Sequence, residues 1–130
     1  MAEGEKRRIL VADDDDLIRK MVSDVLSMHS YIVTSVMDGE SAIAHYEKHD
    51  LLITDYNMGL GMTGVELAKK IKERTPEYKI IVMSGNVDSA KTEKEVLEAG
   101  ADDFIPKPVY TDVLLSKVKK HLSEENQQSV

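Results

Sequence analysis

Acidic, hydroxyl and basic residues stand at the ends of apolar runs in this sequence, where they could serve phosphoryl chemistry. Residues 9–16 read ILVADDDD, so an apolar run leads straight into four aspartates. Asp55 closes the run LLITD, Ser84 closes KIIVMS, and Lys107 follows DFIP. Clustered carboxylates raise one another's pKa unless a cation offsets them. Mg²⁺ binds through carboxylates, waters and phosphate, so it is the cofactor that such a cluster predicts.

The charges of these residues balance only when a divalent cation is present. Asp13, Asp14 and Asp55 carry three negative charges, while Mg²⁺ and Lys107 together carry three positive charges. A carboxylate held beside the metal can attack phosphorus and form an aspartyl phosphate. The cation, the Lys107 ammonium and the Ser84 hydroxyl would stabilise the charge on the phosphoryl oxygens. We therefore predict a phosphoryl-transfer site if the fold brings these residues together.

The elements that must position these residues alternate between short strands and helices. The predicted strands are apolar, β-branched runs at 8–12, 31–36, 51–55, 79–84 and 103–106. Between them, apolar residues recur at helical spacing in four segments: Leu17, Met21, Val22, Val25 and Leu26; Val65, Leu67, Ala68 and Ile71; Val96, Leu97 and Ala101; Val113, Leu114, Val118 and Leu122. Residues 39–48 are expected to form a further helix. Runs that are almost continuously apolar are typical of parallel strands covered on both faces.

This alternation predicts an α/β fold with a doubly wound parallel sheet, because right-handed β-α-β connections place helices on both faces. Ligands of such sheets bind beyond the carboxyl ends of the strands. The strand ends that carry Asp13, Asp55, Ser84 and Lys107 should therefore open on one rim. Negative charge added there would draw Ser84 and Lys107 towards the phosphoryl group, and the neighbouring aromatic Phe104 is the candidate to respond.

Length and composition limit the classes of protein that fit. With 130 residues, 42% of them hydrophobic, the chain fits one domain. We place this domain at 7–122, between an N-terminal tail at 1–6 and a polar tail or linker start at 123–130. The net charge of -7 disfavours nucleic-acid binding, and the lack of cysteine excludes disulfides and thiolate metal sites. The N-terminal apolar run is too short for a signal peptide or a membrane span, so we expect a cytoplasmic protein that does not bind membranes.

Four segments together resemble the receiver domain of two-component response regulators: ILVADDDDLIRKMV, LLITDYNM, IIVMSG and GADDFIPKP. The resemblance covers roughly residues 7–122, and it implies a flavodoxin-like (βα)5 fold with strand order 2-1-3-4-5. It implies that Asp55 is the phosphoacceptor and also contacts the metal. Asp14 would bind Mg²⁺ directly, Asp13 would hold it through water, and the backbone carbonyl of Asn57 would complete the protein ligands.

The same resemblance assigns roles to residues of the fourth and fifth strand ends. Ser84 falls at the Ser/Thr switch position, and Lys107 falls at the position of the site lysine. Phe104 falls at the aromatic switch position, where, without a hydroxyl, it would report its inward or outward state by packing alone. The Lys107–Pro108 peptide bond is expected to be cis.

The function implied is that of a signalling switch. The domain would take a phosphoryl group from a histidine kinase or phosphotransfer protein and change the surface formed by its fourth helix, fifth strand and fifth helix. It would catalyse its own phosphorylation and dephosphorylation without being a turnover enzyme. The output would pass to a downstream effector protein or domain, and the chain would be a monomer or a phosphorylation-dependent dimer. A complete chain would act by protein contact, whereas a fragment would have carried an effector domain after the tail.

Two loops depart from the family pattern. The family commonly has Met-Pro after the phosphoacceptor and a glycine eight residues on, whereas this chain reads DYNMGLGMTG, with Gly59 at the proline position and one residue more. Glycines in place of a fixed φ predict a looser loop over the site. The loop SGNVDSAKTEKE after Ser84 is also one residue longer than usual. These departures bear on partner specificity and phosphate lifetime.

Two other functions fit parts of the pattern. A phosphatase of the haloacid dehalogenase type would share the sheet, Mg²⁺, an aspartate nucleophile and a lysine, and its Asp-x-Asp motif is matched by Asp13 and Asp15. The chain is, however, too short for the usual cap insertion. A receiver-like module that binds partners without phosphorylation would usually lack an acid, the serine or the lysine, and none is missing. Simpler roles are a helix cap for Asp15 or Asp16, core packing for Phe104, and surface positions for the histidines at 29, 45, 49 and 121.

Overall fold

A computed structural model describes residues 6–59 and 61–122, and the predicted tail residues 1–5 and 123–130 lie outside this range. The elements follow one another in the predicted alternation: β1 (Arg8–Ala12), α1 (Asp16–Met28), β2 (Ile32–Val36), α2 (Gly39–His45), the 3-10 turn η1 (Tyr46–Lys48), β3 (Leu51–Asp55), α3 (Gly64–Arg74), β4 (Lys79–Ser84), α4 (Ser89–Glu98), β5 (Asp103–Pro106) and α5 (Thr111–Leu122). The strands form one parallel sheet in the order β2-β1-β3-β4-β5. The predicted doubly wound, flavodoxin-like fold is confirmed.

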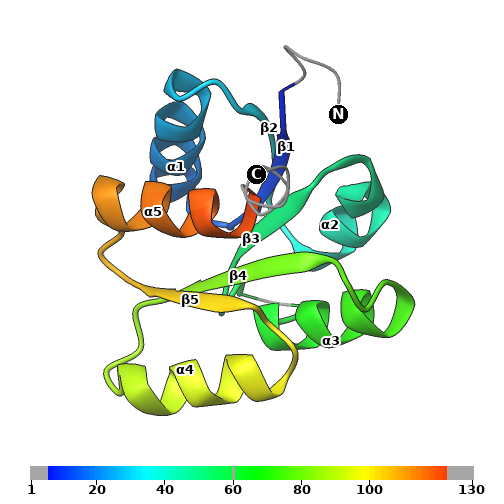
Figure 1. Ribbon diagram of the computed structural model, residues 1–130. Coiled ribbons are helices and arrows are strands. Elements are labelled where there is room, and N and C mark those ends of the chain that lie inside the picture. The colour runs from blue at the N-terminus through cyan, green and yellow to red at the C-terminus, as the bar shows by residue number, and fades with distance from the viewer. Residues whose placement is uncertain (1–5, 60, 123–130) are drawn as a thin grey trace, which may run out of the picture.

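Helices α1 and α5 cover one face of the sheet and α2, α3 and α4 cover the other (Figure 1), so the sheet separates two apolar cores. Side chains alternate between the two faces along each strand. In β3, Leu51 and Ile53 pack with the apolar side chains of α1 and α5, whereas Leu52 packs with those of α2, α3 and α4. Both faces of the central strands are therefore buried, which explains why their sequences are apolar throughout.

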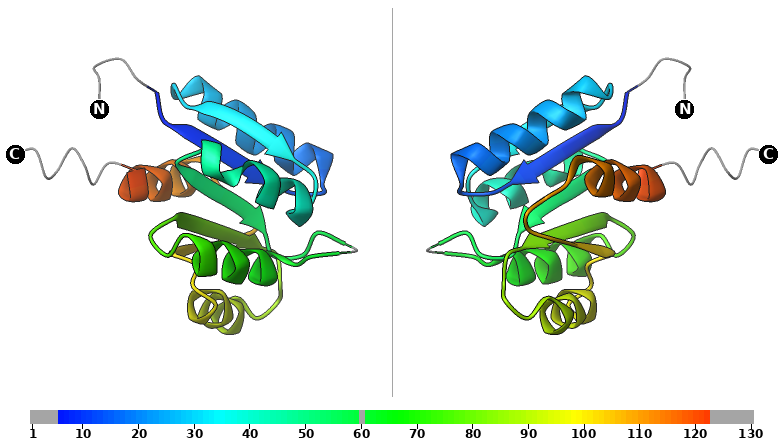
Figure 2. Two further views of the ribbon diagram at one scale, coloured as in Figure 1. Left: turned by 90° about the vertical axis from the view of Figure 1, so that its right-hand side faces the viewer. Right: turned by 90° about the vertical axis from the view of Figure 1, so that its left-hand side faces the viewer.

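All five strands point the same way, so their carboxyl ends form one rim, as Figure 2 shows by the common direction of the arrowheads. The connections from β1 to α1, β3 to α3, β4 to α4 and β5 to α5 leave the sheet at this rim. Every helix within residues 6–59 and 61–122 is too short or too polar to cross a membrane.

Local sequence determines where two helices leave the rim. Asp15 is the N-cap of α1, where its carboxylate accepts hydrogen bonds from the backbone N–H groups of Leu17 and Ile18, as predicted. Helix α3 begins with a capping box in which the Thr63 hydroxyl accepts from the N–H of Glu66 and the Glu66 carboxylate accepts from the N–H of Thr63.

Four expectations about burial and length need correction. The residues of strand β2 are exposed or half-buried because the strand lies at an edge of the sheet. The helix expected at 39–48 is shorter, since α2 ends at His45 before η1 begins. Leu97 is 42% exposed, since α4 buries only Thr92 and Val96. His121 is buried against β5 instead of lying on the surface, because it binds the carboxylate of Asp103.

Candidate phosphoryl-transfer site

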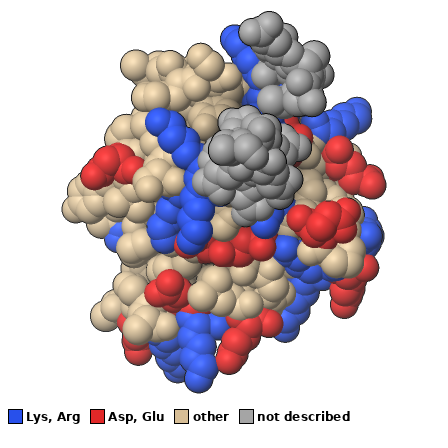
Figure 3. Space-filling view, viewed as in Figure 1, with Lys and Arg blue, Asp and Glu red and all other residues tan. Residues whose placement is uncertain are grey.

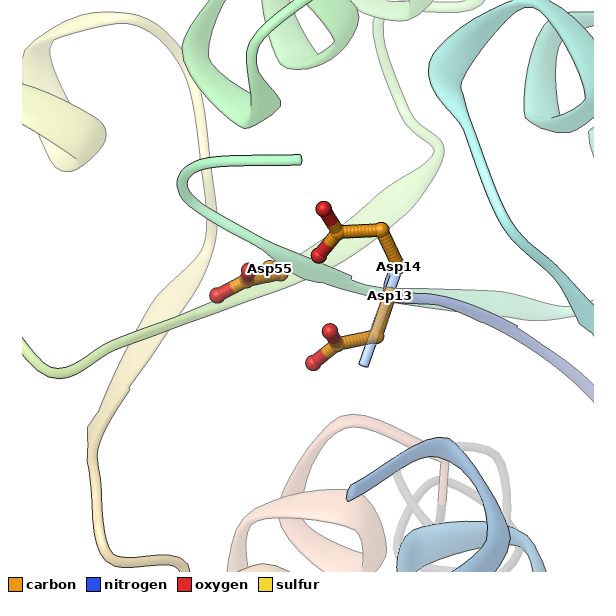
Figure 4. Close-up of side chains that lie close together, drawn as sticks. All are labelled: Asp13, Asp14 and Asp55. Carbon is orange, nitrogen blue, oxygen red and sulfur yellow. The ribbon is translucent and has the colours of Figure 1, made fainter. Parts of the chain in front are cut away.

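Three carboxylates gather at the rim, from the ends of two neighbouring strands (Figure 4). Asp13 and Asp14 directly follow β1, and Asp55 is the last residue of β3, which pairs with β1. One carboxylate oxygen from each residue lies within 4.8 Å of the others. Asp13 and Asp55 are buried, while Asp14 is exposed. The sheet thus brings together acids that are about forty residues apart in the chain.

The four consecutive aspartates have different surroundings. The N–H of Asp13 donates to the carbonyl of Val36 at 3.1 Å, and its Oδ1 accepts from the N–H of Asp15 at 2.9 Å. The Arg19 guanidinium donates to the Asp13 carbonyl oxygen at 2.9 Å and to Asp16 Oδ1 at 2.6 Å. Arg19 therefore stabilises the turn that carries the four aspartates. Arg19 was not among the predicted site residues, although its spacing of three from Asp16 on a predicted helix indicates an ion pair between the two side chains.

Lys107 contacts the cluster from the end of β5. Its Nζ lies 2.9 Å from Asp55 Oδ1 and 3.4 Å from Asp13 Oδ2. The backbone N–H of Lys107 donates to the Ser84 carbonyl at 2.8 Å. The Lys107–Pro108 peptide bond is cis, which is the isomer that the resemblance implies. The lysine side chain is 19% exposed, so the ion pair is largely shielded from solvent.

The electrostatics of the cluster favour a cation. Burial raises the pKa of Asp13 and of Asp55 above the ordinary value of 3.8, and the mutual repulsion of the two carboxylates adds to the rise for Asp55. Burial acts to lower the pKa of Lys107, but Asp55 and Asp13 outweigh it and raise the pKa. One ammonium faces three carboxylates, which leaves two negative charges uncompensated. Oxygen ligands with this surplus charge fit a hard divalent ion such as Mg²⁺.

Ser84 closes β4 on the same rim and is buried. Its Oγ accepts from the N–H of Asn86 at 3.1 Å, and the Asn86 side chain donates to Thr92 in α4 at 3.3 Å. A chain of hydrogen bonds therefore runs from Ser84 to α4. Asn57 lies two residues after Asp55, where its side chain accepts from the N–H of Gly59 at 3.2 Å.

The turn after Asp55 is shaped by glycines. Gly59 and Gly61 have φ angles of 73° and 96°, which side-chain-bearing residues rarely adopt. Gly64 begins α3 so close to β3 that an added Cβ would collide with the Asp55 carbonyl oxygen. The N–H of Gly64 also donates to the carbonyl of Tyr56 at 2.8 Å. This close approach fixes the backbone on which the Asp55 side chain is carried.

Phe104 lies in β5 with its ring buried on the side of α3 and α4, and the residue is 3% exposed.

Figure 3 shows basic and acidic side chains interspersed over the face of the molecule that carries α4, β5 and α5. Such a mixed surface does not resemble the continuous basic stripe that binds a phosphate backbone.

The fold and the rim define an α/β domain of the flavodoxin-like class, with an aspartate cluster and a lysine at the carboxyl ends of its strands. Residues 9–119 match the family model for the response regulator receiver domain. The chain belongs to this family.

Individual relatives agree with this assignment. The chain is 32% identical over 119 residues to the chemotaxis protein CheY of Bacillus subtilis, which covers 89% of this chain and 98% of CheY. It is 34% identical over 110 residues to a cyclic di-GMP phosphodiesterase of Thermotoga maritima, covering 85% of this chain but 29% of that protein. The crystal structure of the receiver domain of NtrX from Brucella abortus superposes with a TM-score of 0.84 at 29% identity, covering 89% of this chain and 98% of that one.

The chain spans 15 to 29% of the length of several longer curated relatives that it matches. Receiver domains of two-component response regulators are phosphorylation-dependent, generally non-enzymatic switches that act with histidine kinases and effector domains. They bind Mg²⁺ at an acidic pocket, and Asp13, Asp14 and Asp55 form such a cluster here.

Proposed function

We propose that this chain is a switch whose phosphoacceptor is Asp55. The supporting observation is the contact of Asp55 with Lys107 inside the three-carboxylate cluster. In the proposed reaction, a carboxylate oxygen of Asp55 bonds to phosphorus while the bond from phosphorus to the histidine nitrogen of the donor breaks. The donor is a histidine kinase or a phosphotransfer protein. The domain catalyses this transfer and its own later dephosphorylation.

In this proposal Asp13, Asp14, Asp55 and the backbone carbonyl of Asn57 hold Mg²⁺, with Asp13 acting through water. The bound cation supplies positive charge to the phosphoryl oxygens. Lys107 lies in contact with the attacking carboxylate, so its ammonium stabilises the same oxygens without moving far.

The added phosphoryl charge is then expected to draw Ser84 inwards, because the hydroxyl can donate to a phosphoryl oxygen. The hydrogen bonds from Ser84 through Asn86 to Thr92 give this movement a route to α4. Phe104 is the proposed aromatic switch, and the surface of α4, β5 and α5 is the proposed output face. A downstream effector protein or domain reads this face, in the cytoplasm, with the chain a monomer or a phosphorylation-dependent dimer.

The Asp-x-Asp phosphatase alternative is disfavoured by one contact. Its second aspartate would be Asp15, but that carboxylate is committed to the N–H groups that begin α1.

The decisive experiment is the intact mass of the protein after treatment with acetyl phosphate and Mg²⁺. We expect one phosphoryl group on the wild type and on Asp112→Asn, a control acid exposed on α5. Asp55→Asn and chelation of Mg²⁺ should each abolish the adduct, and Lys107→Ala should slow its formation. An adduct that survives Asp55→Asn but is lost in Asp13→Asn would instead support the phosphatase.

A further inference from the structure

A buried ionic cluster joins α5 to β5 on the side of the sheet opposite the Phe104 ring. The carboxylate of Asp103 lies 2.8 Å from Lys117 Nζ through Oδ1 and 2.9 Å from His121 Nε2 through Oδ2. Asp103 and His121 are each 9% exposed. A carboxylate at this depth needs its partners, because an unpaired buried charge is costly.

The cluster holds both polar backbone groups of Phe104. The N–H of Phe104 donates to Asp103 Oδ1 at 2.9 Å, and its carbonyl accepts from Lys117 Nζ at 2.6 Å. Lys117 thus bonds the Asp103 carboxylate and the Phe104 carbonyl at once, and both bonds are charge-assisted. The backbone of Phe104 is fixed by side chains on one face of the sheet while its ring packs into the core on the other.

We propose that Lys117 and Asp103 are positioning residues for the aromatic switch: they clamp the backbone of Phe104 and so hold its ring in the buried position. Because the Phe104 ring is attached to the β5 main chain, a displacement of that main chain would move the ring out of the apolar core. This inference deepens the proposed function, since it rests on Phe104 being the switch residue.

The sequence offers an unusually direct probe, because Phe104 is the single phenylalanine among 130 residues. Labelling with fluorophenylalanine therefore gives one ¹⁹F resonance that reports only this ring. The difference in its chemical shift between H₂O and D₂O measures the exposure of the ring to solvent.

The test compares the labelled wild type with Lys117→Met, which keeps a long apolar stem but removes the donors, and with Lys117→Arg, which restores them. Without phosphoryl donor or analogue, we expect at least a twofold larger solvent isotope shift in Lys117→Met, and a wild-type value in Lys117→Arg. Lys120→Met is the matched control, because Lys120 lies 3.9 Å from the same carboxylate and its side chain is 70% exposed, whereas the Phe104 carbonyl accepts from Lys117. It should leave the resonance unchanged.

A wild-type resonance and isotope shift in folded Lys117→Met would overturn the clamp, as would an equal change in Lys120→Met. If Lys117→Met does not fold, Asp103→Asn gives the same readout, since it removes the charge that binds Lys117. Adding Mg²⁺ and beryllofluoride to the labelled wild type tests the switch role of Phe104 separately. An unchanged resonance in that sample would refute the switch role, whereas the comparison made without beryllofluoride still decides the clamp.

Discussion

Replacing Asp55 by asparagine should stabilise the folded protein when Mg²⁺ is removed. Two unit charges 4.8 Å apart, the upper limit for the acid pairs in this cluster, repel by about 3.5 kcal/mol at an effective dielectric constant of about 20. The ammonium of Lys107, at 2.9 Å from Asp55, attracts the Asp55 carboxylate by about 6 kcal/mol at the same dielectric constant. The attraction therefore offsets most of the repulsion from two neighbours, and the burial of the Asp55 carboxylate remains as the net cost.

The raised pKa of Asp55 gives the sign of this net cost. Burial is its largest cause, and the charge of Asp13 adds to it. Because Lys107 offsets about 6 of the roughly 7 kcal/mol of repulsion from the two neighbouring carboxylates, we expect a gain in unfolding free energy of about 1 kcal/mol for Asp55→Asn in EDTA at neutral pH, or about 4 °C in Tm. The gain should vanish as the pH falls below 3.8, where the carboxyl is protonated in both states.

Mg²⁺ should reverse this order. A ligand that binds only the folded state at about 100 times its Kd adds about 2.7 kcal/mol, and the variant has lost one of the carboxylates that we propose as metal ligands. Thermal denaturation in EDTA and in Mg²⁺, with Asp112→Asn as the control, checks both statements. A variant less stable than the wild type in EDTA, or equal stabilisation of both proteins by Mg²⁺, would refute the reasoning.

Three further predictions concern stability. Gly64→Ala should lower the unfolding free energy in urea by about 1–3 kcal/mol, because the new Cβ meets the Asp55 carbonyl oxygen; an unchanged midpoint would show that α3 can shift. Asp15→Ala should cost about 1 kcal/mol through loss of the α1 N-cap, and Asp15→Asn, which can still cap, should cost less. Burial acts to raise the pKa of Asp103, but Lys117 and His121 outweigh it and lower the pKa. The stability that this carboxylate contributes is therefore present above pH 3.8 and lost as the pH falls through its lowered pKa. Asp103→Asn should flatten the acid limb of the stability curve, and an unaltered limb would contradict this assignment.

Local sequence was sufficient for the order and type of the elements. The apolar runs and the helical spacing are properties of neighbouring residues, and the rule that parallel strands end at one rim converts them into a site. This rule is enough to place Asp13, Asp14, Asp55 and Lys107 together from the sequence alone. The N-cap role of Asp15 is also local, because the acceptor and its donors lie within three residues.

Tertiary packing decided the features that depend on distant elements. The sequence of β2 resembles that of a buried strand, but its place at the sheet edge leaves it partly exposed. Apolar spacing did not reveal that Leu97 faces solvent or that His121 is buried, because the face that a helix turns inwards is chosen by the neighbours it packs against. The clamp of Lys117 on Phe104 joins residues of different elements. Such contacts have no local pattern: a hydrogen bond between side chain and backbone needs only proximity in space, and the docking of α5 on β5 supplies that proximity.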